Sequence, residues 1–290
     1  MSDLRKNPFF HPVTGGLTLV AALALLGVGA FVNAPEPVAA AQTPSQSTAS
    51  DWVDHDYAKV RLVSAQTELG DGSLMLGVEI ALAKGWKTYW RYPGDSGLPP
   101  RFDWSGSQNL KSAEPLWPAP EKFTKPDTTY GYKQHVILPL KVEAADEDEP
   151  LNLSLTFNYG FCDDICVPAE AVFNMTLAPG EGERSVEAAQ IETFEARVPE
   201  ALSARSSRAA ARLENENKLE LLLEGGDGAP PVLIVDGLEG VYFSEAELVH
   251  IGEPSRYEVE LDAGRDITGE MLNLTFLAGG KAWEERVEIR

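Results

Sequence analysis

Apolar and polar side chains alternate in several short stretches of this chain. From Ser73 to Leu82 apolar residues occupy every second position, and the positions between them are mostly small or polar. The alternation returns from Leu151 to Tyr159, and Val136 to Val142 is an apolar run of similar length. A period of two is typical of a β-strand with one buried face. The pattern therefore predicts strands in all three stretches.

Proline and glycine separate these stretches, and helical periodicity is scarce between them. The breaking residues are Pro93-Gly94, Pro99-Pro100, Pro118, Pro120 and Gly131. Short strands divided by such turns favour an all-β fold of the immunoglobulin-like sandwich type. The connections near Gly94 and Pro118 are expected to be long.

The composition changes after Ala178. A run rich in glycine and glutamate, Pro179 to Glu183, is followed by Ser185 to Leu202, where Ala, Glu and Gln predict a helix. Five further strands are predicted beyond it: Lys218–Leu223, Val232–Val235, Tyr257–Leu261, Leu272–Phe276 and Glu285–Ile289. We therefore predict two immunoglobulin-like β-sandwich domains, residues 52–180 and 204–290, joined by a linker and helix at 181–203. The second has no cysteine and one histidine, His250, so a structural or partner-binding role is expected.

The N-terminus has the layout of a secretory signal. Arg5 and Lys6 precede an apolar run from Leu17 to Val32, and small residues at 38–41 follow it. Residues 1–41 are therefore predicted to be a signal peptide, residues 42–51 a polar linker, and the protein periplasmic. The run is shorter than the roughly 20 residues that span a bilayer, which makes a retained membrane anchor the weaker alternative.

The chain is strongly acidic, with a formal net charge of -21. The first 41 residues contribute nothing to this charge, because two basic and two acidic side chains cancel there. A field of this sign repels phosphate backbones and anionic lipids, so nucleic-acid binding and peripheral membrane docking are disfavoured. Solubility is the simplest explanation of the charge, and acidic steering of a partner is the alternative.

Candidate chemistry is concentrated at Cys162 and Cys166, the two cysteines of the chain. In an oxidising compartment they are expected to be paired for at least part of the time. An extended segment would separate their Cα atoms by about 13 Å, beyond the roughly 7 Å limit for a disulfide, so the segment must turn. We expect Gly160 to supply the flexible point and Pro168 to discourage a regular continuation. By the loop-entropy model, a disulfide that closes so small a ring stabilises the fold by only about 2 kcal/mol, so it contributes little as a structural bond. Many small disulfide rings are nevertheless unreactive.

Two carboxylates, Asp163 and Asp164, lie between the cysteines in sequence. Unless a helix N-terminus or a basic group intervenes, they disfavour the thiolate and raise the pKa of both thiols. Such a pair is expected to react sluggishly with small oxidants and to exchange quickly once a partner supplies the right environment. No metal site is predicted, since no histidine lies near the two sulfurs, although soft Cu(I) can accept two thiolates.

Several separated sequence blocks resemble the N-terminal periplasmic domain of the thiol:disulfide interchange protein DsbD. The similarity is greater to its ScsB-like branch, which is linked to copper tolerance, and it is clearest from Trp52 to Pro179. The blocks are Gly85-Trp86-Lys87-Thr88-Tyr89-Trp90-Arg91, Pro93-Gly94-Asp95-Ser96-Gly97-Leu98-Pro99, Trp117-Pro118-Ala119-Pro120, Tyr130-Gly131-Tyr132, Tyr159-Gly160-Phe161-Cys162 and Cys166-Val167-Pro168.

The resemblance implies an immunoglobulin-like domain whose cysteine pair receives electrons from a thioredoxin-like module and passes them to periplasmic oxidoreductases. Cys162 and Cys166 match that pair. Asp127 matches an acidic residue of a cap loop that shields the sulfurs, Tyr130 matches an aromatic neighbour of it, and Trp86 and Tyr89 match aromatic residues lining the site.

The chain departs from the better-known members of this family in three ways. Thr128 and Thr129 replace a second acid and a shielding aromatic residue, so weaker shielding is expected. The cysteine spacing also differs. This sequence contains neither the membrane core nor the thioredoxin-like module, so a membrane electron transporter or thioredoxin-like donor on a separate chain is the expected partner, with a periplasmic oxidoreductase as client.

Two functions from different classes follow. The first is thiol-disulfide exchange through a mixed disulfide, as a protein-disulfide reductase component without a cofactor. The second is a non-catalytic periplasmic binding module with a structural disulfide, for which copper tolerance is the setting that the resemblance suggests. A protease is disfavoured, because Gly94-Asp95-Ser96-Gly97 lacks a supporting block around either His55 or His135. A sugar-binding platform of Trp86, Tyr89, Trp90, Tyr92 and Trp104 is disfavoured too, since aromatic residues of strands are more often core.

Overall fold

The alternating stretches form β-strands in the computed structural model, which describes residues 47–125, 127–202, 208–225 and 229–290. Within these residues the chain forms four main sheets and a single short helix, so the predicted all-β class is confirmed. The predicted signal peptide, residues 1–41, and the start of the predicted linker lie outside the described residues. The described part contains no helix that is both long and apolar enough to cross a membrane.

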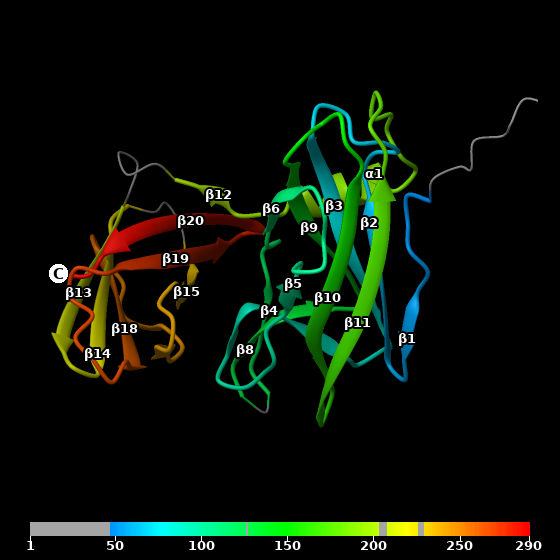
Figure 1. The fold of residues 1–290 in the computed structure, drawn as a ribbon. Coiled ribbons are helices and arrows are strands. Elements are labelled where there is room, and N and C mark those ends of the chain that lie inside the picture. Colours follow the sequence, from blue (N-terminus) through cyan, green and yellow to red (C-terminus); the bar gives the residue numbers. More distant parts are fainter. Residues whose placement is uncertain (1–46, 126, 203–207, 226–228) are drawn as a thin grey trace, which may run out of the picture. The chain divides into compact units, whose positions relative to one another are not determined.

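Two sheets face each other in the N-terminal part (Figure 1). The first has the strand order β1-β2-β3-β9-β6, and the second has the order β11-β10-β4-β8-β7 with β5 paired to β10. Their bounds are β1 (Val53–His55), β2 (Ala58–Ser64), β3 (Ser73–Leu82), β4 (Lys87–Gly94), β5 (Arg101–Asp103), β6 (Leu110–Pro115), β7 (Glu121–Phe123), β8 (Thr129–Lys133), β9 (His135–Ala144), β10 (Leu151–Cys162) and β11 (Cys166–Leu177).

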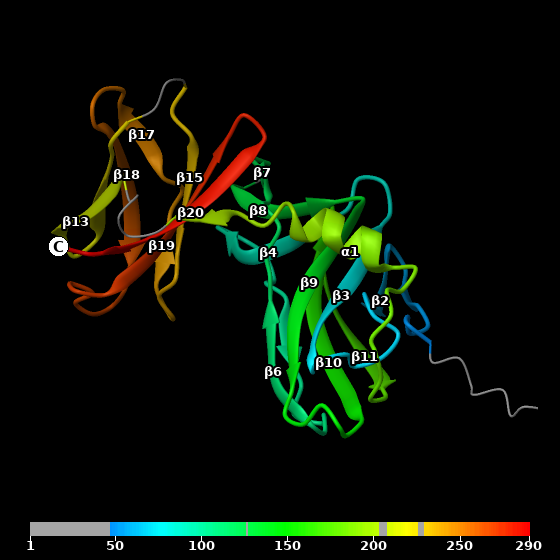
Figure 2. The ribbon, with the colours of Figure 1, turned by 90° about the horizontal axis from the view of Figure 1, so that it is seen from above.

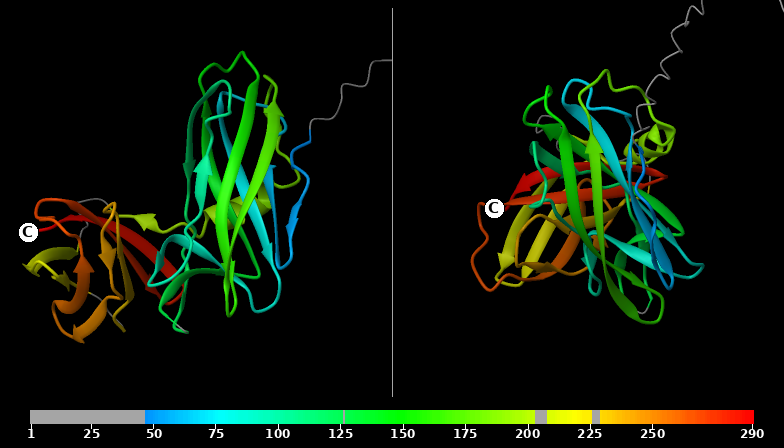
Figure 3. Two further views of the ribbon diagram at one scale, coloured as in Figure 1. Left: turned by 60° about the horizontal axis from the view of Figure 1, so that its bottom comes forward. Right: turned by 45° about the vertical axis from the view of Figure 1, so that its right-hand side comes forward.

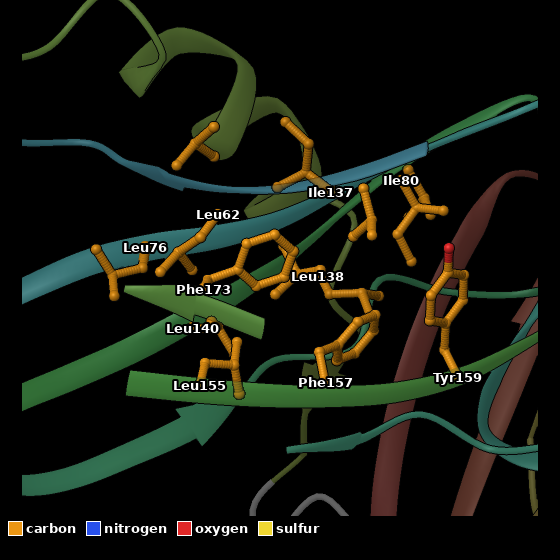
Figure 4. Packing of buried hydrophobic residues seen from close by; sticks show 14 of the residues in the cluster. Leu62, Leu76, Ile80, Ile137, Leu138, Leu140, Leu155, Phe157, Tyr159 and Phe173 are labelled. Atoms are coloured by element: carbon orange, nitrogen blue, oxygen red, sulfur yellow. The ribbon is translucent and has the colours of Figure 1, made fainter. Parts of the chain in front are cut away.

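The core of this sandwich consists of the inward faces of the two sheets (Figure 4). Leu62, Leu76 and Leu138 of the first sheet and Leu155 and Phe157 of the second are fully buried. In β10 the buried positions are every second residue from Leu151 to Tyr159, as the alternation predicts. Burial of such side chains contributes about 1.5–3 kcal/mol each, so this layer stabilises the framework that carries the cysteines.

The first sheet is also covered on its outer face, by the helix α1 (Ala188–Glu195). The helix lies beside β9 and β3 (Figure 2). Ile191 of α1 belongs to the same hydrophobic cluster as Ile137 of β9. A Cβ atom on Gly77 of β3 would lie 2.5 Å from Ile137 Cγ2 and 3.4 Å from Ile191 Cγ1, so the glycine makes room for the helix. Coverage of both faces explains why β9 is a continuous apolar run and does not alternate.

The C-terminal strands form two further sheets around a second hydrophobic cluster. The strand orders are β12-β20-β19-β15 and β13-β14-β18-β16, with β17 paired to β18. Their bounds are β12 (Glu200–Ala201), β13 (Ala209–Asn215), β14 (Lys218–Leu223), β15 (Val232–Asp236), β16 (Tyr242–Phe243), β17 (Glu247–His250), β18 (Ser255–Asp262), β19 (Met271–Ala278) and β20 (Lys281–Glu288). Residues 44–290 form one compact unit, and the division into two domains stays a prediction.

An ion-pair network joins the C-terminal strands to the N-terminal sandwich. Nη2 of Arg91 on β4 lies 3.0 Å from Asp236 Oδ2 on β15 and 2.7 Å from Glu284 Oε1 on β20. Burial alone would lower the pKa of Arg91, but the two carboxylates raise it, so the guanidinium stays charged. The C-terminal strands therefore fix the side chain of Arg91 on β4.

Three expectations from the sequence are wrong in detail. The helix expected from Ser185 to Leu202 covers Ala188–Glu195 alone, because Ser185 bonds to the first sheet and Pro199 disfavours helix at Val198. Gly160 is not the turn and Pro168 does not end the strand, since both lie within the β10–β11 ladder. The last residues of the expected linker belong to the fold, because Ser50 N donates to Leu62 O at 2.8 Å.

The Gly77→Val substitution tests the packing of α1 on the sheet. The new side chain would collide with Ile137 and Ile191, and we expect the free energy of unfolding to fall by about 1–3 kcal/mol, as for other overpacked cores. Chemical denaturation measures this change. Ala81→Val, on the same strand at a partly buried position, is the control. An equal loss of stability in both variants would contradict this account of Gly77.

Candidate functional site

The two cysteines lie opposite each other at the end of the β10–β11 hairpin. β10 and β11 form a long hairpin, drawn in green in Figure 3. Its antiparallel register runs without a shift from Leu151–Leu177 to Cys162–Cys166. The pair forms a disulfide with a Cα–Cα distance of 4.2 Å, and the chain turns through the three residues between the strands. The turn required by the spacing is therefore present, as the tip of a hairpin.

The two sulfur-bearing residues differ sharply in exposure. Cys162 is 1% exposed, whereas Cys166 is exposed. Next to Cys166 in sequence, Ile165 is 70% exposed at the tip. Since an incoming thiolate must reach a sulfur directly, this arrangement offers Cys166 to a partner and keeps Cys162 covered.

Tyr89 supplies a hydrogen bond to the covered sulfur. Its hydroxyl donates to Cys162 Sγ at 2.7 Å and lies 3.2 Å from Cys166 Sγ. Burial raises the pKa of Tyr89, so the hydroxyl stays protonated and can donate. The ring packs against Gly97, where a Cβ atom would lie 2.5 Å from Tyr89 Cε1. The loop after β4 thus holds the phenol against the disulfide.

Lysines extend from Cys162 across the sheet. Lys87 of β4 is the register partner of both Cys162 on β10 and Lys133 on β8, and directly opposed residues share one face. Lys87 Nζ donates to Thr129 Oγ1 at 2.7 Å. Burial and the charge of Lys133 lower the pKa of Lys87. A basic group therefore lies beside Cys162. Its positive charge opposes the rise in thiol pKa that is expected from Asp163 and Asp164.

The sequence-predicted site residues fall on different faces of the sheet. Tyr89 shares the cysteine face, while Trp86 and Tyr130 belong to the core cluster. Trp86 packs 5.4 Å from Phe161 and stacks on Tyr57, so it supports the strand end rather than the sulfurs. Burial raises the pKa of Tyr130, and the nearest carboxylates, including Glu245, raise it further. The roles inferred for these residues by resemblance stay predictions.

Asp127 lies in the loop between β7 and β8, the segment that the resemblance identifies as a cap. Its side chain is exposed, and its charge acts on Lys87, where it raises the pKa of the lysine. Lys125, two residues before Asp127 in this loop, lines the cavity beside Cys162. The following residue, Thr128, donates its N–H to Asp95 Oδ2 at 3.2 Å.

Both loops beside the disulfide are held by the C-terminal strands. Glu245 pairs with Lys122 of β7, and its Oε2 accepts a bond from Thr128 Oγ1 at 2.8 Å. Tyr242 of β16 donates to Asp95 Oδ1 at 2.7 Å. Burial alone would raise the pKa of Glu245, but the bonds from Lys122 and Thr128 lower it, so the carboxylate is ionised at neutral pH.

A cavity of about 340 Å³ opens beside Cys162. It is lined by Gly85, Lys87, Lys122, Phe123, Thr124, Lys125, Lys133, Cys162 and Asp163. Sequence reasoning did not select these lysines, or Glu245. Lys87 could have been found, because it is two residues from Tyr89 on the same strand and must share its face. Glu245 could not, because its position depends on contact between distant strands.

The described residues contain no group of three or more His, Cys, Asp or Glu side chains arranged to hold a metal ion. Binding of Cu(I) by the two reduced thiols is a separate case, because it needs just two soft ligands.

Comparison with known proteins identifies the relatives of this site. Residues 59–178 match the family model of the thiol:disulfide interchange protein DsbD, N-terminal. Among solved structures, the N-terminal periplasmic domain of ScsB from Proteus mirabilis matches with 25% identity and a TM-score of 0.69, covering 83% of this chain and 98% of that one. No curated protein sequence matches the chain.

The Tyr89→Phe substitution tests the hydrogen bond to Cys162. In a Cys166→Ser background, loss of the donor is expected to raise the pKa of the Cys162 thiol by about 1–2 units, since hydrogen bonds to charged groups contribute about 1.5–3 kcal/mol. Ultraviolet absorbance of the thiolate measures the titration. Tyr130→Phe, also buried, is the control and should leave that pKa unchanged. Equal titration curves in all three proteins would contradict the assignment.

The Glu245→Gln substitution tests the attachment of the β7–β8 loop. It removes the ion pair to Lys122 and weakens the bond from Thr128, so hydrogen–deuterium exchange of the backbone amides around Thr128 should become faster. In the wild-type protein the same protection should be lost as the pH falls through the lowered pKa of Glu245, and be retained above it. Glu247→Gln, at an exposed position on β17, is the matched control. Unchanged exchange in Glu245→Gln would show that the contact does not hold the loop.

Proposed function

Because residues 59–178 belong to the family of DsbD N-terminal domains, we propose that this protein is a periplasmic carrier of electrons in thiol-disulfide exchange. The observation that carries the proposal is the asymmetry of the disulfide, with Cys166 exposed and Cys162 covered beside a hydroxyl donor. A partner thiolate can then attack Cys166, and the Tyr89 hydroxyl stabilises the Cys162 thiolate that leaves.

Reduction of the pair proceeds in two displacements. A thiolate of the donor attacks Cys166 Sγ, the Cys162–Cys166 bond breaks, and Cys162 leaves as a thiolate that accepts the Tyr89 hydrogen bond. The second cysteine of the donor then attacks the donor's own sulfur in the mixed disulfide and releases Cys166. The donor is oxidised to a disulfide and the pair gains two electrons, with protons taken from solvent.

Oxidation by a client reverses these roles. The Cys166 thiolate attacks the client disulfide and forms a mixed disulfide, while one client sulfur leaves as a thiolate. Cys162 then attacks Cys166 Sγ, the bond to the client breaks, and the disulfide of the hairpin forms again. The client has gained the two electrons that the pair has lost, and no cofactor takes part.

The donor and the client are proposed to be thioredoxin-like proteins on separate chains. Ile165 supports this, since a side chain 70% exposed beside the reactive sulfur offers an apolar contact to a docking protein. The periplasmic location rests on the similarity to a periplasmic domain and on the layout of residues 1–41.

A structural brace is the competing function of the disulfide. The bond joins strands that are already paired along twelve residues, so it ties together no separate elements. Its contribution to stability is therefore expected to be small, about 2 kcal/mol or less by the loop-entropy model. This favours the carrier over a binding module with an inert ring.

The reduction potential of the pair distinguishes the two functions. For an exchangeable pair we expect a value between those of thioredoxin and the oxidising periplasmic catalysts, roughly -270 to -120 mV, measured by equilibration with thiol buffers. A value below about -300 mV would indicate an inert bond. The Cys162→Ser variant should also form mixed disulfides through Cys166 with a thioredoxin-fold protein. The Cys166→Ser variant, which retains the covered cysteine alone, is the control and should form far fewer.

A further inference from the structure

The lysines beside Cys162 are unusual in so acidic a chain. Acidic side chains outnumber basic ones by 45 to 24, yet Lys87, Lys122, Lys125 and Lys133 line the cavity beside Cys162. Four other cavities in the described part of the chain contain at most two basic side chains each. We call these four lysines, with Phe123 between them, the lysine patch.

Phe123 holds two of these cations close together. Lys133 Nζ lies 4.3 Å and Lys87 Nζ 5.0 Å from the centre of its ring. Lys87 is 8% exposed, and Thr129 accepts one of the three N–H bonds of its ammonium group. Two like charges over one ring repel each other, and this repulsion adds to the effect of burial in lowering the pKa of Lys87. An arriving anion would relieve the repulsion.

Carboxylates of the protein neutralise the patch incompletely. Glu245 pairs with Lys122, Asp127 acts on Lys87, and Asp163 lines the same cavity. Lys125 and Lys133 are exposed, and within the described residues neither forms an ion pair. The two outer lysines therefore remain available to a partner that approaches the cavity beside Cys162.

We propose that the lysine patch is a docking surface for an oxidoreductase that carries carboxylates beside its reactive cysteine. The inference deepens the proposed function and rests on it. The net charge of the chain repels an acidic partner over most of its surface, and the patch attracts it at the disulfide. A concave site with low-dielectric walls focuses this field, so the charge pattern sets the orientation of the encounter as well as its rate.

Three cysteine peptides of equal length, with the cysteine flanked by Asp, Ser or Lys residues, serve as probes. The rate at which each reduces the disulfide of the mature protein is measured at low salt, with mercaptoethanol as a reference that carries no charge besides that of its reacting thiolate. Each rate is compared between protein variants, so intrinsic differences in thiol reactivity cancel. The test variant is Lys125→Gln/Lys133→Gln, and Lys111→Gln/Lys141→Gln, at exposed lysines of the other sheet, is the control.

In the test variant, reduction by the Asp-flanked peptide should become about fivefold slower, as expected for two charges acting across several ångströms of water, while the Lys-flanked peptide becomes faster. Mercaptoethanol, which brings the thiolate charge alone, should be slowed no more than the Ser-flanked peptide and less than the Asp-flanked peptide. Roughly 1 M salt should abolish the difference between the peptides. Thermal unfolding of the variants, all altered at exposed positions, checks that they fold.

Two results would overturn the proposal, and they differ in whether the proposed exchange function also fails. If the test and control variants respond alike to the Asp-flanked peptide, the docking surface is wrong and the exchange function stands. If mercaptoethanol and all three peptides leave the disulfide intact, the exchange function fails and the docking surface fails with it.

Discussion

The register of three neighbouring strands, β10, β4 and β8, is the constraint on which the site depends. It sets Cys162 opposite Lys87, and Lys87 opposite Lys133, and because side chains alternate along a strand it also places Tyr89 on the same face. A slip of one residue in β4 would turn Tyr89 and Lys87 into the core and bring Thr88 out. The hydrophobic core excludes that slip, because Trp90 and Phe161 fill the inner face. Packing in the sandwich thus determines the chemistry outside it.

The same register explains why the disulfide is asymmetric. Cys162 ends a strand that is covered by β4, while Cys166 begins an outer strand whose partner is β10. The inner position sets Cys162 opposite Lys87 and gives it the shorter contact with the Tyr89 hydroxyl, and the outer position leaves Cys166 exposed. A thiol-disulfide carrier needs such a difference, since one sulfur must meet partners and the other must leave and return within the protein.

Much of this architecture could be predicted from the sequence, and the failures have identifiable causes. The alternation at Ser73–Leu82 coincides with β3, because half-buried strands record their burial in a period of two. The extent of β10 and β11 could not be read in this way, since Gly160 and Pro168 are ordinary turn signals. Gly160 is tolerated in the ladder because Leu98 occupies the space where its side chain would be, with Leu98 Cβ 2.5 Å from the ideal Cβ position. The site was predicted at the cysteines themselves, whereas the surrounding lysines required knowledge of which strands are neighbours.

The C-terminal strands contribute to the site through charge rather than catalysis. Burial alone would raise the pKa of Glu245, between β16 and β17, but the bonds from Lys122 and Thr128 lower it. In return Glu245 fixes the loop that adjoins the disulfide. Asp236 and Glu284 do the same for Arg91, two residues beyond Tyr89 on β4. The C-terminal region thereby uses carboxylates to hold basic side chains of β4 and β7. Lys125 and Lys133 are not held in this way, and they lie where an outside carboxylate can reach them. This division between held and available cations is the pattern expected if the C-terminal strands position the site and the remaining lysines meet its partners.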